Sequence, residues 1–424
     1  MMSLNEQAVQ RRNYRALLAE GSFFITGMAF MNASSVIPVF IHTYTRSVLL
    51  AGLATTITHA ASIILQVVVG PYVRSIRNVP AYITRVMFLF RPLPFIMIPL
   101  LYIHPDPWLT VAVFLLIYTL LFAGDGLILV PWTDLFSRTV SSGKRGSLLG
   151  TQQLIGGVGA LLAGLIVKAV LDSPHLVNDQ RYAIIFGASA LFLTLSAATM
   201  PFTRDLPRTT EATRPGHRQY YKALPLYLRR HAGFRQVVLI RILSFVMAMI
   251  APFVILFGQN KLALSPGAVS TLIYIQLVGG LSGGVIWGRV SRFLGNHRVI
   301  LLTQGLGLLL AFSMMVMALP FQQLLPVYLI WPLVFINGVN LSAWIGFMNH
   351  TIDIVSDEER TIYLLISNLT VFPFSFLPFL AGLFVQHFGY LPVFIVSTLA
   401  GVVSLLLALR LKPASVLMEK KTTI

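Results

Sequence analysis

Apolar segments of about 20 residues alternate with short polar segments along almost the whole chain. A segment of roughly 20 apolar residues is long enough to cross the hydrocarbon core of a bilayer as an α-helix. Turn residues such as Pro, Gly, Asn and Asp mark the breaks between the segments. The pattern predicts twelve spans, at 18–41, 48–72, 80–103, 108–135, 147–170, 182–203, 236–259, 268–290, 298–319, 324–350, 361–386 and 390–411.

Composition agrees with a multi-pass α-helical membrane protein. The chain is 56% hydrophobic and 11% charged, whereas a soluble domain carries about 25% charged residues. A β-barrel would show short segments of alternating polarity instead. The chain contains no cysteine, which excludes disulfides and thiolate metal sites. No phosphate-binding loop, metal-spaced histidine cluster or nucleophile motif occurs, so we expect no enzyme activity, no cofactor and no metal.

The placement of the positive charges predicts the orientation. With the N-terminus inside, 24 of the 31 Lys/Arg lie in inner segments and four in outer segments. This asymmetry follows the positive-inside rule, so we expect both termini in the cytoplasm. The same asymmetry explains the net charge of +17 without a nucleic-acid partner.

The longest polar segment, 204–235, carries eight Lys/Arg near mid-chain. We interpret it as a cytoplasmic linker between two membrane-embedded halves. The predicted organisation is a cytoplasmic tail at 1–17, a six-helix bundle at 18–203, the linker at 204–235, a second six-helix bundle at 236–411 and a cytoplasmic tail at 412–424.

The two halves resemble each other. An Arg-rich loop entered from a glycine follows the second span, from Gly70 through Arg74, and another follows the eighth, from Gly288 through Arg292. Polar positions after spans four and ten recur at an offset of 215 residues, which places Asp125 opposite Asn340. Two related halves joined by a long linker are typical of a transporter whose site lies between the repeats.

With its paired loops, twelve spans and central linker, the chain resembles the major facilitator superfamily over essentially its whole length. The resemblance implies twelve transmembrane helices in two pseudo-symmetric six-helix bundles, and secondary transport of a small organic solute by alternating access. It also implies a monomer in the bilayer of the plasma or inner membrane. Whether a proton is co-transported stays open.

The second loop keeps Gly288, Gly295 and Arg298 of the family pattern, whereas the first keeps only Gly70 and scattered arginines. Both loops share one departure. Arg74 and Arg292 stand where the family usually has Asp. In the family that Asp helps to close the cytoplasmic side by pairing with positive groups. Asp134 and Asp353 are therefore candidates for pairs with the charges reversed. An alternative is that these arginines only follow the positive-inside rule. The gating candidates are Gly70, Arg74, Asp134, Gly288, Arg292 and Asp353.

Ionisable residues inside spans are energetically expensive and mark functional sites. Asp125, between two glycines in the fourth span, is the candidate for ion coupling; a structural carboxylate is the alternative. Arg91 could pair with Asp125 or Glu20, but we expect Glu20 to be interfacial. Arg241 is close enough to the inner surface to extend toward it.

Amide and indole side chains recur in the spans that line such transport sites, although they suit helix–helix hydrogen bonds equally well. Two glycine runs, at 156–164 and at Gly280, Gly284 and Gly288, predict faces where helices pack closely. The substrate-binding candidates are Asn32, Asp125, Trp132, Gln152, Gln153, Gln276, Asn337, Asn340 and Trp344.

Two other functions stay open. A receptor or sensor on the same fold would bind a ligand without moving it across the membrane. A membrane enzyme acting on lipids would need clustered acids or histidines near an interface. The only dense acidic run, 357–359, more naturally stabilises the start of the eleventh span, because acids favour a helix N-terminus.

Overall fold

The computed structural model describes residues 4–69, 76–103, 106–140, 142–205, 228, 231–319, 327–355 and 360–413. All regular elements in these ranges are helices. Within them, eleven segments are long and apolar enough to cross a membrane, and they correspond to the second through twelfth predicted spans. The predicted all-helical membrane fold is therefore confirmed.

The chain divides into two compact units. Unit 1 comprises residues 1–46 and 57–214, and unit 2 comprises residues 47–56 and 215–424. The division falls near the middle of the chain, where the sequence predicts the linker at 204–235. Most of that linker lies outside the described residues, and the predicted domain boundaries remain a prediction.

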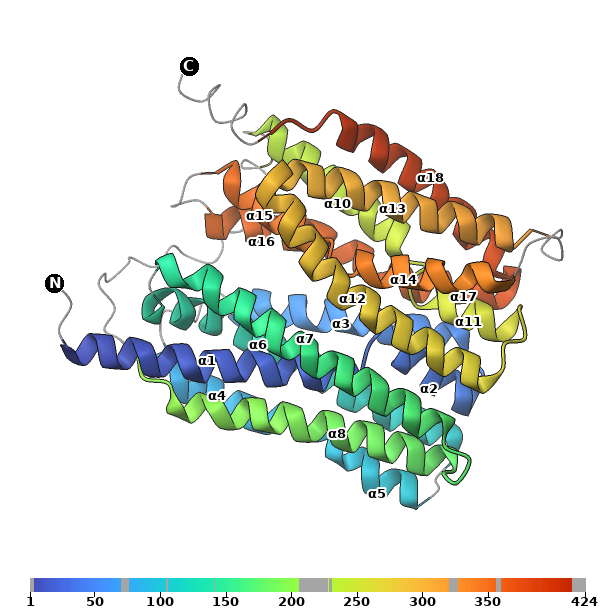
Figure 1. The fold of residues 1–424 in the computed structure, drawn as a ribbon, viewed down its shortest axis with the longest axis horizontal. Coiled ribbons are helices and arrows are strands. Elements are labelled where there is room, and N and C mark those ends of the chain that lie inside the picture. Colours follow the sequence, from blue (N-terminus) through green and yellow to red (C-terminus); the bar gives the residue numbers. More distant parts are fainter. Residues whose placement is uncertain are drawn as a thin grey trace. The chain divides into compact units, whose positions relative to one another are not determined.

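Unit 1 is organised around its first helix, α1, which packs along both α7 and α8 (Figure 1). A second group of contacts joins α4 to α6. Its elements are α1 (Leu4–Phe30), α2 (Val36–Thr45), α3 (Val48–Val69), α4 (Val79–Phe90), η2 (Leu93–Ile96), α5 (Met97–Tyr102), α6 (Pro107–Thr139), α7 (Ser142–Asp172), α8 (Asn178–Thr199) and η3 (Met200–Phe202), and the first residues of α3 belong to unit 2.

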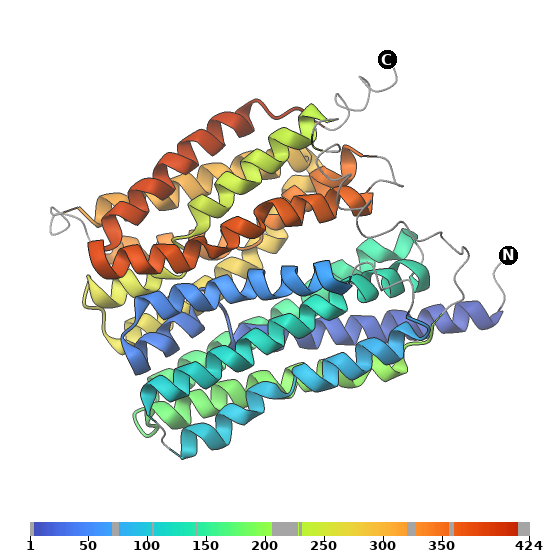
Figure 2. The same ribbon diagram turned by 180° about the vertical axis from the view of Figure 1, so that it is seen from behind.

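In unit 2 the last helix, α18, packs along α10 and α13, and α12 packs along α14 (Figure 2). The elements are α10 (Ala232–Ala248), α11 (Phe253–Asn260), α12 (Pro266–Leu294), α13 (Asn296–Met317), η5 (Val327–Leu329), α14 (Ile330–Asn340), α15 (Trp344–Asp353), α16 (Arg360–Val371), η6 (Phe372–Phe376), α17 (Leu377–Phe388) and α18 (Tyr390–Leu409).

The first predicted span consists of two helices, α1 and α2. Pro38 explains the break, because a continuous helix would bring its ring against the carbonyl of Ser34 and leave that carbonyl without its N–H donor. In the break, Asn32 Oδ1 accepts hydrogen bonds from the Ser34 N–H at 3.0 Å and from Ser35 Oγ at 2.9 Å. Helix α1 begins at Leu4, so residues 4–17 extend the first span's helix beyond its apolar part.

Proline also interrupts the third and eleventh spans. The α-helix of the third span ends at Phe90. Pro92 then precedes the short 3₁₀-helix η2, which contains Pro94. The Pro/Phe-rich stretch of the eleventh span likewise forms the 3₁₀ segment η6 between α16 and α17. Proline lacks the N–H donor of the helical hydrogen bond, which explains both interruptions.

Glycines allow the closest helix approaches in both units. A Cβ at Gly156 of α7 would lie 2.8 Å from the Ile25 side chain of α1, as the first glycine run predicts. In α12, however, the packing face contains Gly279 and Gly283, where a Cβ would overlap backbone carbonyl oxygens of α14. The predicted face at Gly280, Gly284 and Gly288 is wrong by one residue, because a Cβ at either of the last two meets nothing within 4 Å.

Candidate functional site

Three charged side chains meet inside unit 1. Glu20 comes from α1, Arg91 follows the last residue of α4, and Asp125 comes from α6. Glu20 and Arg91 are each only 4% exposed. The interfacial position expected for Glu20 is therefore wrong, since tertiary packing encloses this carboxylate. Arg91 lies within ion-pairing distance of both acids that the sequence offered as partners.

Arg91 is held mainly by Glu20. Its Nη1 lies 2.9 Å from Glu20 Oε1 and donates a second hydrogen bond, 2.5 Å long, to Ser196 Oγ of α8. The guanidinium also lies over the Phe24 ring, 4.7 Å from its centroid, an arrangement that favours a cation. Trp132 Nε1 donates to the other Glu20 oxygen at 3.2 Å. Both carboxylate oxygens of Glu20 are thus hydrogen-bonded.

Asp125 occupies a looser position in the same cluster. Its Oδ1 lies 3.9 Å from Arg91 Nη2, beyond hydrogen-bonding distance. Its side chain is 19% exposed, whereas that of Glu20 is 5% exposed. With both acids ionised, the three residues carry one net negative charge. Burying an excess charge is unfavourable, so this cluster can stabilise one additional positive charge, and Asp125 is the accessible carboxylate.

The local sequence explains how the helices approach each other at this point. The proline break after Phe90 places Arg91 at the end of α4, where its N–H still donates to the Met87 carbonyl at 2.9 Å. A Cβ at Gly124 would lie 2.6 Å from the Phe90 side chain, and one at Gly126 would overlap the Ser62 carbonyl oxygen of α3. The glycines on both sides of Asp125 therefore permit close packing.

Unit 2 carries a cation in a different setting. Arg241 of α10 is half-buried. Its Nη1 donates to Ser367 Oγ, and its Nη2 donates to Asn368 Oδ1 at 3.0 Å. Among the described residues, no Asp or Glu lies within ion-pairing distance of this guanidinium. Both hydrogen-bond partners belong to α16 and are neutral.

Three predicted substrate-binding amides hold backbone groups. Asn32 forms the turn between α1 and α2. Gln152 Nε2 donates to the Leu17 carbonyl at 2.6 Å and joins α7 to α1. Asn337 Nδ2 donates to the Ala251 carbonyl at 3.1 Å, beside the break between α10 and α11. These contacts give the three side chains a structural role.

Other predicted binding residues keep free hydrogen-bonding capacity. Gln276 is fully buried, and neither end of its amide has a partner among the described residues. Asn340 Oδ1 is buried and likewise unpaired in the described part of the chain. Trp344 is 52% exposed, and Gln153 is also exposed. Because buried amides are normally hydrogen-bonded, Gln276 and Asn340 are the amides of this set best suited to receive a ligand.

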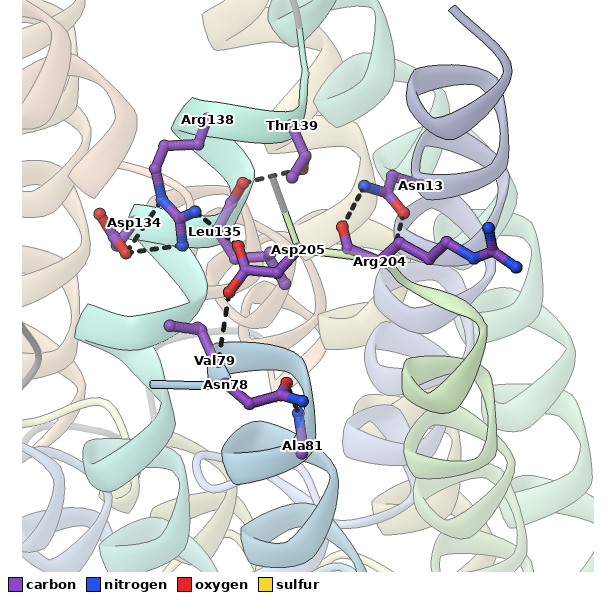
Figure 3. A network of polar contacts seen from close by, with 10 residues as sticks. All are labelled: Asn13, Asn78, Val79, Ala81, Asp134, Leu135, Arg138, Thr139, Arg204 and Asp205. Atoms are coloured by element: carbon purple, nitrogen blue, oxygen red, sulfur yellow. Dashed lines mark hydrogen bonds and ion pairs between the residues drawn. The ribbon is translucent and has the colours of Figure 1, made fainter. Parts of the chain in front are cut away.

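A second charged network lies at the end of α6 (Figure 3). Arg138 Nη2 contacts Asp134 Oδ2 at 3.0 Å, and its Nη1 contacts Asp205 Oδ1 at 2.5 Å. Asp205 also accepts from the Val79 N–H of α4 at 3.4 Å. Burial lowers the pKa of Arg138, but its bonds to Asp205 and Asp134 outweigh that effect and raise the pKa. The network joins α6, α4 and the segment after η3.

The predicted gating pairs stay predictions. Gly70 and Arg74 lie outside the described residues, and Asp134 contacts Arg138. In unit 2, Asp353 accepts from Asn296 Nδ2 at 2.6 Å. Arg292 lies over the Phe293 ring, 5.6 Å from its centroid. Gly288 is exposed on α12.

Comparisons with known proteins agree with this architecture. A family profile described as Major Facilitator Superfamily matches residues 20–374. The uncharacterised proteins Rv2209 of Mycobacterium tuberculosis and Mb2232 of Mycobacterium bovis are each 25% identical to the chain over 198 residues. That alignment covers 46% of this chain and 38% of each relative.

Solved structures of transporters share the fold. A D-xylose–proton symporter matches with a TM-score of 0.70 and 16% identity, over 95% of this chain and 98% of its own. A bacterial homologue of the human lysosomal transporter Spinster, in an inward-facing and unoccupied conformation, matches with a TM-score of 0.62 and 14% identity, over 94% and 95% of the two chains. At these identities the likeness establishes the fold alone.

Proposed function

The chain belongs to the major facilitator superfamily, a family of secondary transporters, and we propose that it couples the movement of a small organic solute to a proton bound at Asp125. We further propose that both termini and the linker at 204–235 face the cytoplasm. The positive-inside asymmetry of the sequence supports that orientation.

One observation carries the proposal of proton coupling: a buried cluster in unit 1 combines two carboxylates with a single guanidinium. A proton on one carboxylate makes the cluster neutral, which a poorly solvated environment favours. At the position of unit 2 that the repeat places opposite Asp125, the residue is the neutral Asn340. We therefore place the proton site in unit 1.

Asp125 is the better proton acceptor of the two acids. Glu20 uses both oxygens, one toward Arg91 and the other toward Trp132 Nε1. Asp125 has a single longer contact, 3.9 Å from Arg91, and a more exposed side chain. A proton can therefore reach Asp125 without first breaking the hydrogen bonds of Glu20.

Protonation at Asp125 would change the attraction between helices. When Asp125 is ionised, it attracts the Arg91 guanidinium toward α6. When Asp125 is neutral, that attraction is lost and Arg91 is held by Glu20 and Ser196 of α1 and α8. The proton would thus alter how strongly α6 is held to its neighbours, which is the kind of differential interaction that shifts a conformational equilibrium.

Infrared spectroscopy tests the proton site without a known solute. The purified protein should show a C=O stretch of a protonated carboxylic acid that disappears as pH rises. We expect this band to be missing from Asp125→Asn. It should persist in Asp172→Asn, which removes a surface carboxylate paired with Lys168. A band that survives unchanged in Asp125→Asn would refute the assignment.

Transport itself requires a solute. A thermal-shift screen of purified protein identifies binders, because a ligand specific for the folded state stabilises it by mass action. In proteoliposomes, the solute found should then drive proton movement in the wild type, and this coupled proton flux should be lost in Asp125→Asn. Binding without any flux would instead support the receptor function that the sequence leaves open.

A further inference from the structure

A basic pocket lies at the N-terminal end of α1, away from the buried charge cluster. Its volume is about 720 Å³, and α1 and the η3 turn after α8 form its walls. Arg11, Arg12 and Arg15 of α1 line one side, and Thr199 and Phe202 lie on the other. The pocket is contained within unit 1.

The charge of this pocket is one-sided. Arg15 lies four residues after Arg11 and three after Arg12, so it neighbours both on the surface of α1, and all three line the pocket. All three are exposed, and no Asp or Glu is among the described residues that line the pocket. Arg12 Nε donates to the Phe202 carbonyl at 2.7 Å, which anchors one guanidinium across the pocket. The site is therefore built to receive an anion.

An apolar surface leads to the pocket along α8. Ile184, Leu191, Leu195 and Phe202 are 41%, 49%, 38% and 60% exposed. Their spacings of seven, four and seven residues place them on one face of a helix. Because α8 with η3 is a candidate membrane span, this exposed face is suited to contact lipid tails.

We propose that the pocket binds the headgroup phosphate of an anionic glycerophospholipid, with the acyl chains against the exposed face of α8. The three arginines match the phosphate charge, and guanidinium groups bind phosphate with directed hydrogen bonds. The exposed apolar face of α8 would contact the acyl chains of the same lipid. A soluble anion would use the arginines and leave the apolar face without a role. This proposal is independent of the proposed transport function.

The test uses the full-length protein purified in detergent and titrated with phosphatidylglycerol or phosphatidylcholine, with bound lipid counted by native mass spectrometry. We expect the wild type to retain phosphatidylglycerol at a concentration at least tenfold lower than phosphatidylcholine. Each basic group near an anionic lipid contributes several-fold to affinity, so R11Q/R12Q/R15Q should lose this preference by roughly tenfold or more. The preference should weaken in high salt.

Two further variants make the result specific. R289Q/R292Q/R298Q removes the same charge from exposed arginines of α12 and α13 that do not line the pocket and should keep the preference. R11Q/R15Q keeps the hydrogen bond from Arg12 to Phe202 and should still lose most of the preference for phosphatidylglycerol. This double variant replaces the triple variant if the latter does not fold.

Two outcomes overturn the proposal. An equal loss in R289Q/R292Q/R298Q and R11Q/R15Q would mean that only the total basic charge matters. Inorganic phosphate that displaces phosphatidylglycerol at the same concentration would identify a site for a soluble anion. Failure of phosphate to compete, together with weaker binding of short-chain phosphatidylglycerol, supports the lipid.

Discussion

Replacing Glu20 by Gln should destabilise unit 1 more than replacing Asp125 by Asn. The substitution keeps the shape of the side chain but removes the charge 2.9 Å from Arg91 Nη1. Arg91, only 4% exposed, then depends on Asp125 at 3.9 Å. Removing one partner of a buried ion pair typically costs about 3–5 kcal/mol. Because the more distant Asp125 carboxylate compensates the Arg91 charge only in part, we expect a loss near the lower end of that range.

The expected magnitude differs for Asp125→Asn. At an effective dielectric constant of about 20, Coulomb's law gives an attraction of roughly 6 kcal/mol at 2.9 Å and roughly 4 kcal/mol at 3.9 Å. Asp125→Asn leaves the Arg91–Glu20 pair intact. The attraction that it loses is largely offset, because the excess negative charge of the cluster no longer has to be buried. We therefore expect Asp125→Asn to change the free energy of unfolding by about 1 kcal/mol or less, well below the loss of a full buried partner.

Reversible unfolding of the purified protein in mixed micelles of detergent and SDS measures both variants. Arg91→Gln and the double variant with Glu20→Gln complete a double-mutant cycle, and we expect a coupling energy of about 2 kcal/mol or more between Glu20 and Arg91. A loss for Asp125→Asn equal to or larger than that for Glu20→Gln would refute this reasoning, because it would make Asp125 the main partner of Arg91.

Three more predictions follow from particular contacts, and the same unfolding assay measures them. Arg241→Gln should change the free energy of unfolding by no more than about 1 kcal/mol, or raise it, because no carboxylate among the described residues loses a partner. A loss above about 3 kcal/mol would contradict the neutral surroundings described for this guanidinium. Gly283→Ala should destabilise unit 2 by about 1–3 kcal/mol, because its Cβ would overlap the Val339 carbonyl. Gly284→Ala should be neutral or stabilising. Equal effects of the two substitutions would contradict the assignment of Gly283 to the face that packs against α14. Asp205→Asn should lower the free energy of unfolding by about 1.5–3 kcal/mol, because it weakens the charge-assisted bond to Arg138. Asp353→Asn should lower it by less than about 1 kcal/mol, because the partner of Asp353 is an exposed Asn296 amide. The reverse order would count against the network at the end of α6.

The apolar pattern of the sequence was sufficient to predict the type and approximate limits of the membrane helices. Eleven of the twelve predicted spans appear as candidate spans in the described residues. This succeeds because crossing a bilayer requires a local property, a sufficient length of apolar residues, which can be read without knowing any tertiary contact. The interruption at the Pro/Phe-rich stretch of the eleventh span has an equally local cause, because proline lacks the N–H donor of the helical hydrogen bond.

Which side chains meet depends on how the helices pack in three dimensions. Glu20 looked interfacial because it stands at the start of an apolar segment, yet α1 extends back to Leu4 and packing against α8 encloses the carboxylate. The packing glycines of α12 differ by one residue from those predicted, because one residue corresponds to about 100° of rotation and sequence spacing alone does not define which face meets a neighbour. The pairing of Arg91 with Glu20 depends on that same rotation in α1, α4 and α6 together, so the sequence could name the charged residues but could not choose between the two acids.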